Sequence, residues 1–206
     1  MYFDRRCKIT YISHGATIFS EEGRFSDMEN HPQLNENGAE EMTKICEYLK
    51  KRKVKNDRIY TSSAKRCIQS AKYVSKVYKK DFEIIDLKPR QCGTFSGMTF
   101  EQVETKFPEE LKQLIYSPEI NTPEDAESTS EFINRVNVVI NKIVEENDGN
   151  RVIIVTHPDV IKAAVCDVLE IPHTSFHRIY IRTGSATQIS YFSSWKSLVY
   201  SDYTPL

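Results

Sequence analysis

Residues 151–159 of the chain read Arg-Val-Ile-Ile-Val-Thr-His-Pro-Asp, an aliphatic run that stops at polar residues. A strand buried on both faces of a parallel sheet has this composition, because its residues do not alternate between apolar and polar. Pro158 and Asp159 suit the first turn of a helix, where proline loses no hydrogen bond and a carboxylate faces the helix dipole. The stretch therefore predicts a buried strand, a polar turn that carries His157, and a helix.

The same order of elements recurs earlier in the chain. Three short apolar segments, residues 8–12, 58–60 and 83–87, are bounded by polar or glycine-containing turns. The first ends at Ser13-His14-Gly15, and the second at Thr61-Ser62-Ser63, a plausible helix N-cap. Strands that alternate with helices in this way predict an α/β fold with a mainly parallel central sheet.

Apolar stripes at three- and four-residue spacing predict helices that pack against this sheet. The stripes are Met42, Ile45, Cys46 and Leu49; Phe132, Ile133, Val136, Val139, Ile140 and Ile143; and Ile161, Ala164, Val165 and Val168. Near the C-terminus, residues 178–182 and 187–192 flank Thr183-Gly184-Ser185, which predicts a hairpin. Residues 107–130 contain three prolines and predict a helix followed by an irregular excursion over the sheet, either a lid or a plain surface loop.

Composition and charge limit the class of protein. The chain has 206 residues, 28% of them charged and 39% hydrophobic, so we expect one folded domain over residues 1–206. A net charge of −1 gives no global positive field for nucleic acid or an anionic membrane. No aliphatic run approaches the roughly 20 residues of a bilayer span, and residues 1–7 lack a signal-peptide core. Five widely separated cysteines without a Cys-x-x-Cys pair favour reduced thiols, so we expect a cytoplasmic protein.

Polar residues directly after the predicted strands are the first candidates for a site. Ligands of open α/β sheets bind at the carboxyl ends of the strands, and both His14 and His157 fall there. Arg66 falls in the first turn of the helix after the second strand, where free backbone N–H groups and the helix dipole favour an anion. Each residue alone could be a structural histidine or a solvated arginine. Together they predict an anion site.

Six segments, taken in order, resemble the motifs of one enzyme family. They are Ser13-His14-Gly15-Ala16-Thr17 followed by Gly23-Arg24-Phe25; residues 33–38 (Gln-Leu-Asn-Glu-Asn-Gly); residues 62–71 (Ser-Ser-Ala-Lys-Arg-Cys-Ile-Gln-Ser-Ala); residues 92–97 (Cys-Gly-Thr-Phe-Ser-Gly); Glu127-Ser128 with Arg135; and Thr156-His157 followed by Ile171-Pro172. The family is the histidine phosphatase superfamily, also called phosphoglycerate mutase-like. The resemblance covers most of the chain and implies a three-layer sandwich in which helices flank the central sheet.

The resemblance also implies a role for each residue of the anion site. His14 would attack phosphorus and become a phosphohistidine, Arg66 would clamp non-bridging oxygens, and His157 would donate hydrogen bonds to the transferring group. Thr17 and Ser20 would contact the phosphate. No cofactor and no metal is required.

A zinc site is the alternative interpretation of the later histidines. His173, His177 and Glu170 have possible ligand spacing, but they lie across a turn at Pro172 rather than on one helix.

Three positions depart from the family pattern. Ser13 stands where the family has an arginine, so only a hydroxyl would bind substrate there, at a cost of about 1.5–3 kcal/mol. Pro89, four residues before Gly93, stands where the family usually has the glutamate that protonates the leaving oxygen. General acid help is worth about 10²–10⁴-fold and matters most for alkyl esters. Pro158 stands where glycine is common and removes one backbone N–H.

Other residues are candidates to replace the missing groups. Arg90 could supply a cation, and the candidate acids are Glu21, Glu22, Asp27 and Asp159. Each is also an ordinary surface or capping residue. The loops that choose the substrate are expected within residues 23–31 and 89–125.

Two functional hypotheses follow. The favoured one is a phosphomonoester hydrolase that acts through a phosphohistidine intermediate on a small phosphorylated metabolite, with a preference for good leaving groups. The alternative is a catalytically impaired family member that binds a phosphorylated ligand or protein without turnover. A phosphoglycerate mutase fits poorly, because the chain is too short for the segments that shield a phosphoenzyme from water. The oligomeric state is not predicted.

Overall fold

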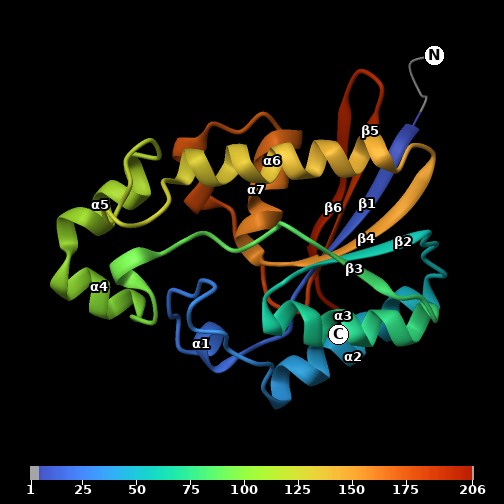
Figure 1. The fold of residues 1–206 in the computed structure, drawn as a ribbon, viewed down its shortest axis with the longest axis horizontal. Coiled ribbons are helices and arrows are strands. Elements are labelled where there is room, and N and C mark those ends of the chain that lie inside the picture. The colour runs from blue at the N-terminus through green and yellow to red at the C-terminus, as the bar shows by residue number, and fades with distance from the viewer. Residues whose placement is uncertain (1–4, 206) are drawn as a thin grey trace.

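The computed structural model describes residues 5–205 and centres on one six-stranded sheet of order β3-β2-β4-β1-β5-β6 (Figure 1). The strands are β1 (Arg5–Ser13), β2 (Arg58–Ser62), β3 (Phe82–Ile85), β4 (Asn150–Thr156), β5 (Ala186–Phe192) and β6 (Lys196–Tyr203). The first four pair in parallel, and β5 is antiparallel to both β1 and β6. The predicted mainly parallel sheet is confirmed.

Helices cover both faces of the sheet and make the three layers of the predicted sandwich (Figure 1). They are α1 (Ile18–Glu21), α2 (Glu36–Lys51), α3 (Lys65–Tyr78), α4 (Phe100–Lys106), α5 (Pro108–Tyr116), α6 (Thr129–Glu146) and α7 (Pro158–Val168), with two 3₁₀ helices, η1 (Gly93–Phe95) and η2 (His173–Arg178). In the described part of the chain, no helix combines the length and the apolarity that a membrane crossing needs.

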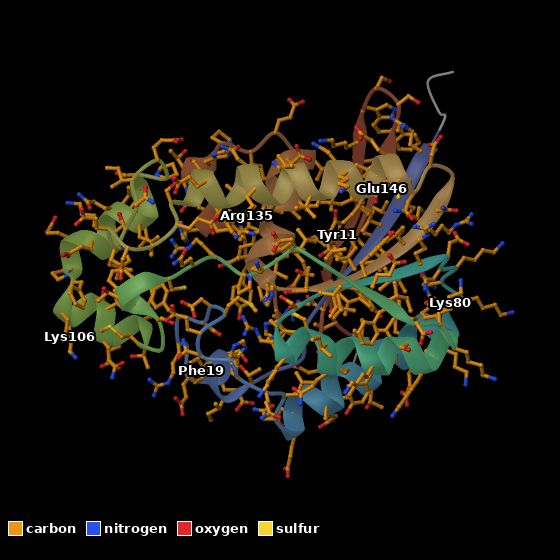
Figure 2. The ribbon with its side chains drawn as sticks, viewed as in Figure 1. Tyr11, Phe19, Lys80, Lys106, Arg135 and Glu146 are labelled. Carbon is orange, nitrogen blue, oxygen red and sulfur yellow. The ribbon has the colours of Figure 1, made fainter. Side chains whose placement is uncertain are left out.

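The aliphatic strand β4 shows why both faces of the sheet are apolar. Val152 and Ile154 pack in the core beneath α6 and α7, whereas Ile153 and Val155 pack in the core beneath α2 and α3. Tyr11 of β1 lies in the first of these cores (Figure 2). The predicted apolar stripes supply the helix side of both cores, as side-chain alternation across a strand requires.

The predicted hairpin is wrong in its first strand. Residues 179–185 form no strand, and β5 instead turns at Ser193–Trp195 into β6. The reason is that β5 already has β1 on one side and β6 on the other, so it offers no free edge. The Thr183-Gly184-Ser185 segment lies beside the end of β1 instead, where the Gly184 N–H donates to the His14 carbonyl at 2.9 Å.

Two boundary predictions also need correction. Helix α3 begins after Ala64, which cannot cap with its side chain, so Thr61-Ser62-Ser63 is not its N-cap. The Ser62 hydroxyl contacts His157 instead, and this contact explains why the polar side chain is kept at the strand end. Strand β3 ends at Ile85, two residues before its predicted end.

Helices α4 and α5 form a small unit with a core of its own. That core contains Phe95, Val103, Leu111 and Leu114, separate from the two cores of the sheet. Residues 107–130 contain the predicted helix, α5, and then an irregular segment that reaches α6. Figure 1 shows α4 and α5 beyond one end of the sheet rather than over a face of it. The unit therefore flanks the edge at which the site residues lie.

Candidate active site

The carboxyl ends of β1, β2 and β4 bring three of the predicted site residues together. His14 follows β1, His157 follows β4, and Arg66 lies in the first turn of α3, just after β2. The two imidazole rings lie 5.5 Å apart between centroids, at an angle of 71°. The Arg66 Nε–H donates to His14 Nε2 at 3.2 Å. Residues distant in sequence thus share one buried cluster.

The hydrogen bonds of His14 define which of its nitrogens is free to react. Nδ1 lies 2.9 Å from the Gly15 carbonyl oxygen, which can only accept, so Nδ1 carries the hydrogen. Nε2 therefore holds the lone pair that the Arg66 Nε–H meets. Burial, reinforced by the Arg66 charge, lowers the pKa of His14 from 6.5 to about 3, although the Gly15 carbonyl opposes the shift. At neutral pH the ring is an uncharged nucleophile.

His157 is held in an equally buried setting. Its Nε2 lies 2.9 Å from the Ser62 hydroxyl and 3.5 Å from the Cys67 sulfur. Burial, and then the charge of Arg66, lowers the pKa of His157 well below its ordinary value. Burial raises the pKa of Cys67 to about 12, so this thiol stays protonated beside the ring. Both histidines are neutral, and Arg66 supplies the positive charge.

Two glycines fix the loop that carries His14. A Cβ atom on Gly15 would lie 2.3 Å from the Gly38 oxygen, and one on Gly38 would lie 2.1 Å from the Ala16 oxygen. No other residue allows the loop after β1 to cross the start of α2 this closely. The Gly15 N–H donates to the Ser70 hydroxyl at 3.1 Å, and the Ala16 N–H to Glu41 Oε2 at 2.8 Å. Helices α2 and α3 therefore anchor the loop.

Glu41 is a residue that the sequence reasoning missed. Besides the Ala16 N–H, its carboxylate accepts the Thr183 hydroxyl at 3.0 Å and so ties the His14 loop to the segment before β5. Its place one turn after Gly38 on α2 is the sequence signal that could have pointed to it.

Ser13 does not lie where the sequence prediction placed it. Its side chain is fully buried, its hydroxyl has no hydrogen-bond partner among residues 5–205, and it does not line the cavity over the histidines. Thr17 and Ser20 do line that cavity, but their side chains form the capping box of α1. The Ser20 hydroxyl donates to the Thr17 carbonyl at 2.9 Å, so it must rotate to reach a phosphate.

A cavity of about 840 Å³, here called the histidine cavity, opens over His14, Arg66 and His157. Its walls come from α1 and α2, from the loop around Pro89, from α4 and α5, and from the segment after η2. A site of this volume accommodates a whole small-molecule ligand. The cavity that the histidines line is therefore larger than a phosphate group needs.

Pro89 and Arg90 lie on the wall of the histidine cavity, and both are buried. Arg90 Nη1 donates to the Glu127 carbonyl at 2.7 Å. The Glu127 carboxylate forms a two-pronged ion pair with Arg135 of α6, at 2.7 and 2.8 Å, and Arg135 Nη2 donates to the Pro89 carbonyl at 3.4 Å. Arg135 is labelled in Figure 2. The wall therefore holds a fixed cation and, at Pro89, no proton donor.

The candidate acids near α1 do not present a free carboxyl group to the site. Glu22 pairs with Arg24 and does not line the histidine cavity. Glu21 does line it and accepts a hydrogen bond from the Asn37 amide at 2.6 Å.

The two candidate aspartates are also engaged. Asp27 is buried and accepts the backbone N–H groups of Glu29 at 2.9 Å and of Cys92 at 3.4 Å, so it braces two loops. Asp159 lies 2.9 Å from the Lys162 ammonium. Burial is the largest single effect and raises the pKa of Asp159, but Lys162, Arg90 and His177 together outweigh it, and the net shift is downward. An ionised Asp159 cannot act as the missing acid at neutral pH.

The residues of the zinc alternative do not form a ligand set. His173 Nδ1 lies 2.8 Å from the Ser130 hydroxyl, whereas His177 lines the histidine cavity. Between residues 5 and 205, no group of three or more histidine, cysteine or acidic side chains is arranged to hold a metal ion.

Relatives of known identity show the same architecture. Among solved structures, a phosphoserine phosphatase from Entamoeba histolytica, in complex with 3-phosphoglyceric acid, matches with a TM-score of 0.84 at 21% identity, covering 96% of this chain and 98% of that one. Bacillus stearothermophilus YhfR matches with a TM-score of 0.85 at 21% identity, covering 94% and 95%. These likenesses establish the fold.

Sequence relatives include two phosphatases. The metal-independent phosphoserine phosphatase of Arabidopsis thaliana is 28% identical over 159 residues, which are 76% of this chain and 66% of that protein. Phosphoserine phosphatase 1 of Hydrogenobacter thermophilus is 25% identical over 174 residues, 82% of this chain and 79% of that protein. The family model for the histidine phosphatase superfamily (branch 1) matches residues 9–202. The chain belongs to the histidine phosphatase superfamily.

Proposed function

We propose that this protein hydrolyses phosphate monoesters of small molecules through a phosphohistidine at His14. The observation that carries the proposal is the neutral His14 ring, whose Nε2 lone pair lies beside the Arg66 guanidinium in a cavity large enough for a substrate. Membership of the histidine phosphatase superfamily and the named phosphatase relatives support the same chemistry.

The first step transfers the phosphoryl group to the protein. The Nε2 lone pair of His14 forms the N–P bond while the P–O bond to the alcohol breaks, and the bonding electrons leave with that oxygen. Arg66 turns its N–H groups from Nε2 toward the non-bridging oxygens, and His157 donates an N–H to the same charge. Both side chains are buried beside His14 before the substrate arrives, so the reorganisation that the step requires of Arg66 is a local turn of its guanidinium.

The second step restores the enzyme. A water molecule attacks phosphorus on the side opposite Nε2, the N–P bond breaks, and its electrons return to the ring as the lone pair. Both protons of the water stay on phosphate oxygens, so the product leaves as H2PO4− with the water oxygen bonded to phosphorus.

The leaving oxygen receives no proton from the wall at Pro89. A good leaving group, such as a phenoxide or a carboxylate, departs without this help, whereas an alkoxide does not. We therefore expect aryl and acyl phosphates to react faster than alkyl phosphates. The phosphoserine on which the named relatives act is an alkyl ester, so it is the informative comparison.

Hydrolysis of phenyl phosphate and phosphoserine between pH 5 and 8 tests the proposal. The wild-type protein should release phosphate from both esters, faster from phenyl phosphate by about 10²-fold or more. His14→Ala should abolish both rates. Equal rates for the two esters would reveal a proton donor, and no turnover at all would favour the impaired, ligand-binding alternative.

We further propose a cytoplasmic location and a single domain over residues 1–206. Cys46, Cys67, Cys92 and Cys166 are buried thiols that form no disulfide, which suits a reducing compartment. Fractionation of cells with an antibody to the chain tests the location.

A further inference from the structure

We propose that the substrate is an aryl phosphate whose ring system packs against α4, α5 and the segment after η2. The inference rests on the proposed function, since it concerns the leaving group of the same ester. It names a substrate class, the phosphate monoesters of bulky aromatic alcohols of the phenol type.

The histidine cavity is larger than a phosphoryl group. His14, Arg66 and His157 line a cavity of about 840 Å³, and a phosphoryl group fills only part of that volume. The rest of the chamber must hold the leaving group. Much of its wall is apolar and is supplied by three separate parts of the chain, namely Phe25, then Phe100, Leu111, Leu114 and Ile115, and then Tyr180 and Ile181.

Two of these aromatic side chains are exposed. Phe100, at the start of α4, is 48% exposed, and Tyr180 is 76% exposed. Apolar surface on a cavity wall is stabilised when a ligand covers it, and aromatic rings gain further from ring contacts. Leu111 and Leu114 line the same cavity and belong to the α4–α5 core, so part of the apolar wall is packed in place.

The charged side chains of the same chamber already have partners within the protein. The pairs are Arg24 with Glu22, Lys44 with Glu40, Lys162 with Asp159, Arg182 with Asp202, Glu21 with Asn37, and Glu41 with the Ala16 N–H and Thr183. A polar leaving group would compete with these contacts, whereas an apolar ring competes with none. The wall therefore favours a ring over a sugar or an amino acid.

The chemistry of the wall agrees with its shape. Pro89 lies on the same wall and provides no proton, so the leaving oxygen must depart as an anion. A phenoxide does so far more easily than an alkoxide. Aryl phosphates thus fit both the apolar lining of the cavity and the lack of a proton donor at Pro89, and these two features involve different residues.

The test measures binding separately from turnover. In the His14→Ala protein, which retains Arg66, calorimetry gives the affinities of phenyl phosphate and 2-naphthyl phosphate. The second ring should tighten binding by about five- to tenfold, the factor for covering about 40–55 Å² more apolar surface. In the double variant His14→Ala, Phe100→Ala, the ratio of the two affinities should be close to one.

Tyr116→Ala is the matched control, because Tyr116 lies on the same α4–α5 unit, is 66% exposed and does not line the histidine cavity. It should leave the affinity ratio unchanged. Tyr180→Ala provides a second variant at an exposed position. Equal affinities for the two esters, or a ratio that neither Phe100→Ala nor Tyr180→Ala lowers, would overturn the inference.

Turnover by the wild-type protein keeps the two proposals apart. Hydrolysis of phenyl phosphate without a naphthyl preference in binding leaves the hydrolase and refutes the aromatic leaving group. A naphthyl preference without hydrolysis of either ester keeps the aromatic ligand and refutes the hydrolase.

Discussion

Acid should lower the free energy of unfolding of this protein through His14, and the substitution His14→Gln should remove that contribution. An unfolded histidine takes up a proton below about pH 6.5, whereas His14 in the folded state stays neutral until about pH 3. Because its folded pKa is depressed, the contribution of His14 to stability is fully present above pH 6.5. It is lost as the pH falls from 6.5 toward 3, the window in which the unfolded state binds the extra proton.

The size of this effect follows from the two pKa values. Between pH 7 and pH 5 the unequal protonation lowers the free energy of unfolding by about 2 kcal/mol, and over the whole window by about 5 kcal/mol. Aspartates and glutamates titrate mostly below pH 5, so the upper interval isolates the histidines. His14→Gln removes the titrating ring. Between pH 7 and pH 5, the free energy of unfolding of the variant should fall by about 2 kcal/mol less than that of the wild type.

Urea unfolding at pH 7 and at pH 5, in phosphate-free buffer, measures these changes. His14→Asn is the matched second substitution and should give the same difference as His14→Gln. His157→Gln should shift the pH dependence in the same direction, since its pKa is also lowered. If the wild type and both His14 variants lose equal stability, His14 titrates as a hydrated side chain, and the neutral nucleophile derived from its burial is refuted.

Two further substitutions test how the His14 loop is held. Gly38→Ala places a Cβ atom 2.1 Å from the Ala16 oxygen, so we expect a loss of about 1–3 kcal/mol or more in urea unfolding, with a lower kcat. Unchanged stability would show that the crossing relaxes freely. Glu41→Ala removes the acceptor of the buried Ala16 N–H, for a loss of about 1–3 kcal/mol, and Glu41→Gln should restore part of it. Identical stability of the two Glu41 variants would contradict this role.

Local patterns predicted the frame of the protein well. The aliphatic run in β4 and the stripes on α2, α6 and α7 reflect burial on one or both faces, and burial leaves a periodic signal in the sequence. The hairpin prediction failed because residues 178–182 and 187–192 show the same sequence pattern as two strands that do pair. Only the sheet order, with β6 on the free side of β5, decides between partners.

The part of the candidate site that lies directly after the strands was predictable from the sequence. His14, Arg66 and His157 each follow a strand, and a parallel sheet must bring such residues to one edge. Ser13 was misplaced because neighbouring residues at the end of a strand point to opposite faces, so its hydroxyl is buried while the His14 ring reaches the cavity. Glu41 was missed because its partners, Ala16 and Thr183, are distant in sequence.

The sequence by itself therefore determined the α/β sheet, the helices on its faces and the convergence of His14, Arg66 and His157 at one edge, since each depends on periodicity or on position along one strand or helix. Only the tertiary structure decided that both histidines are neutral, that Asp159 is ionised, and that α4 and α5 supply apolar residues to the cavity that Arg66 also lines. The burial of a side chain and the charges around it depend on atoms from segments that are distant in the sequence. A local sequence pattern therefore does not predict them.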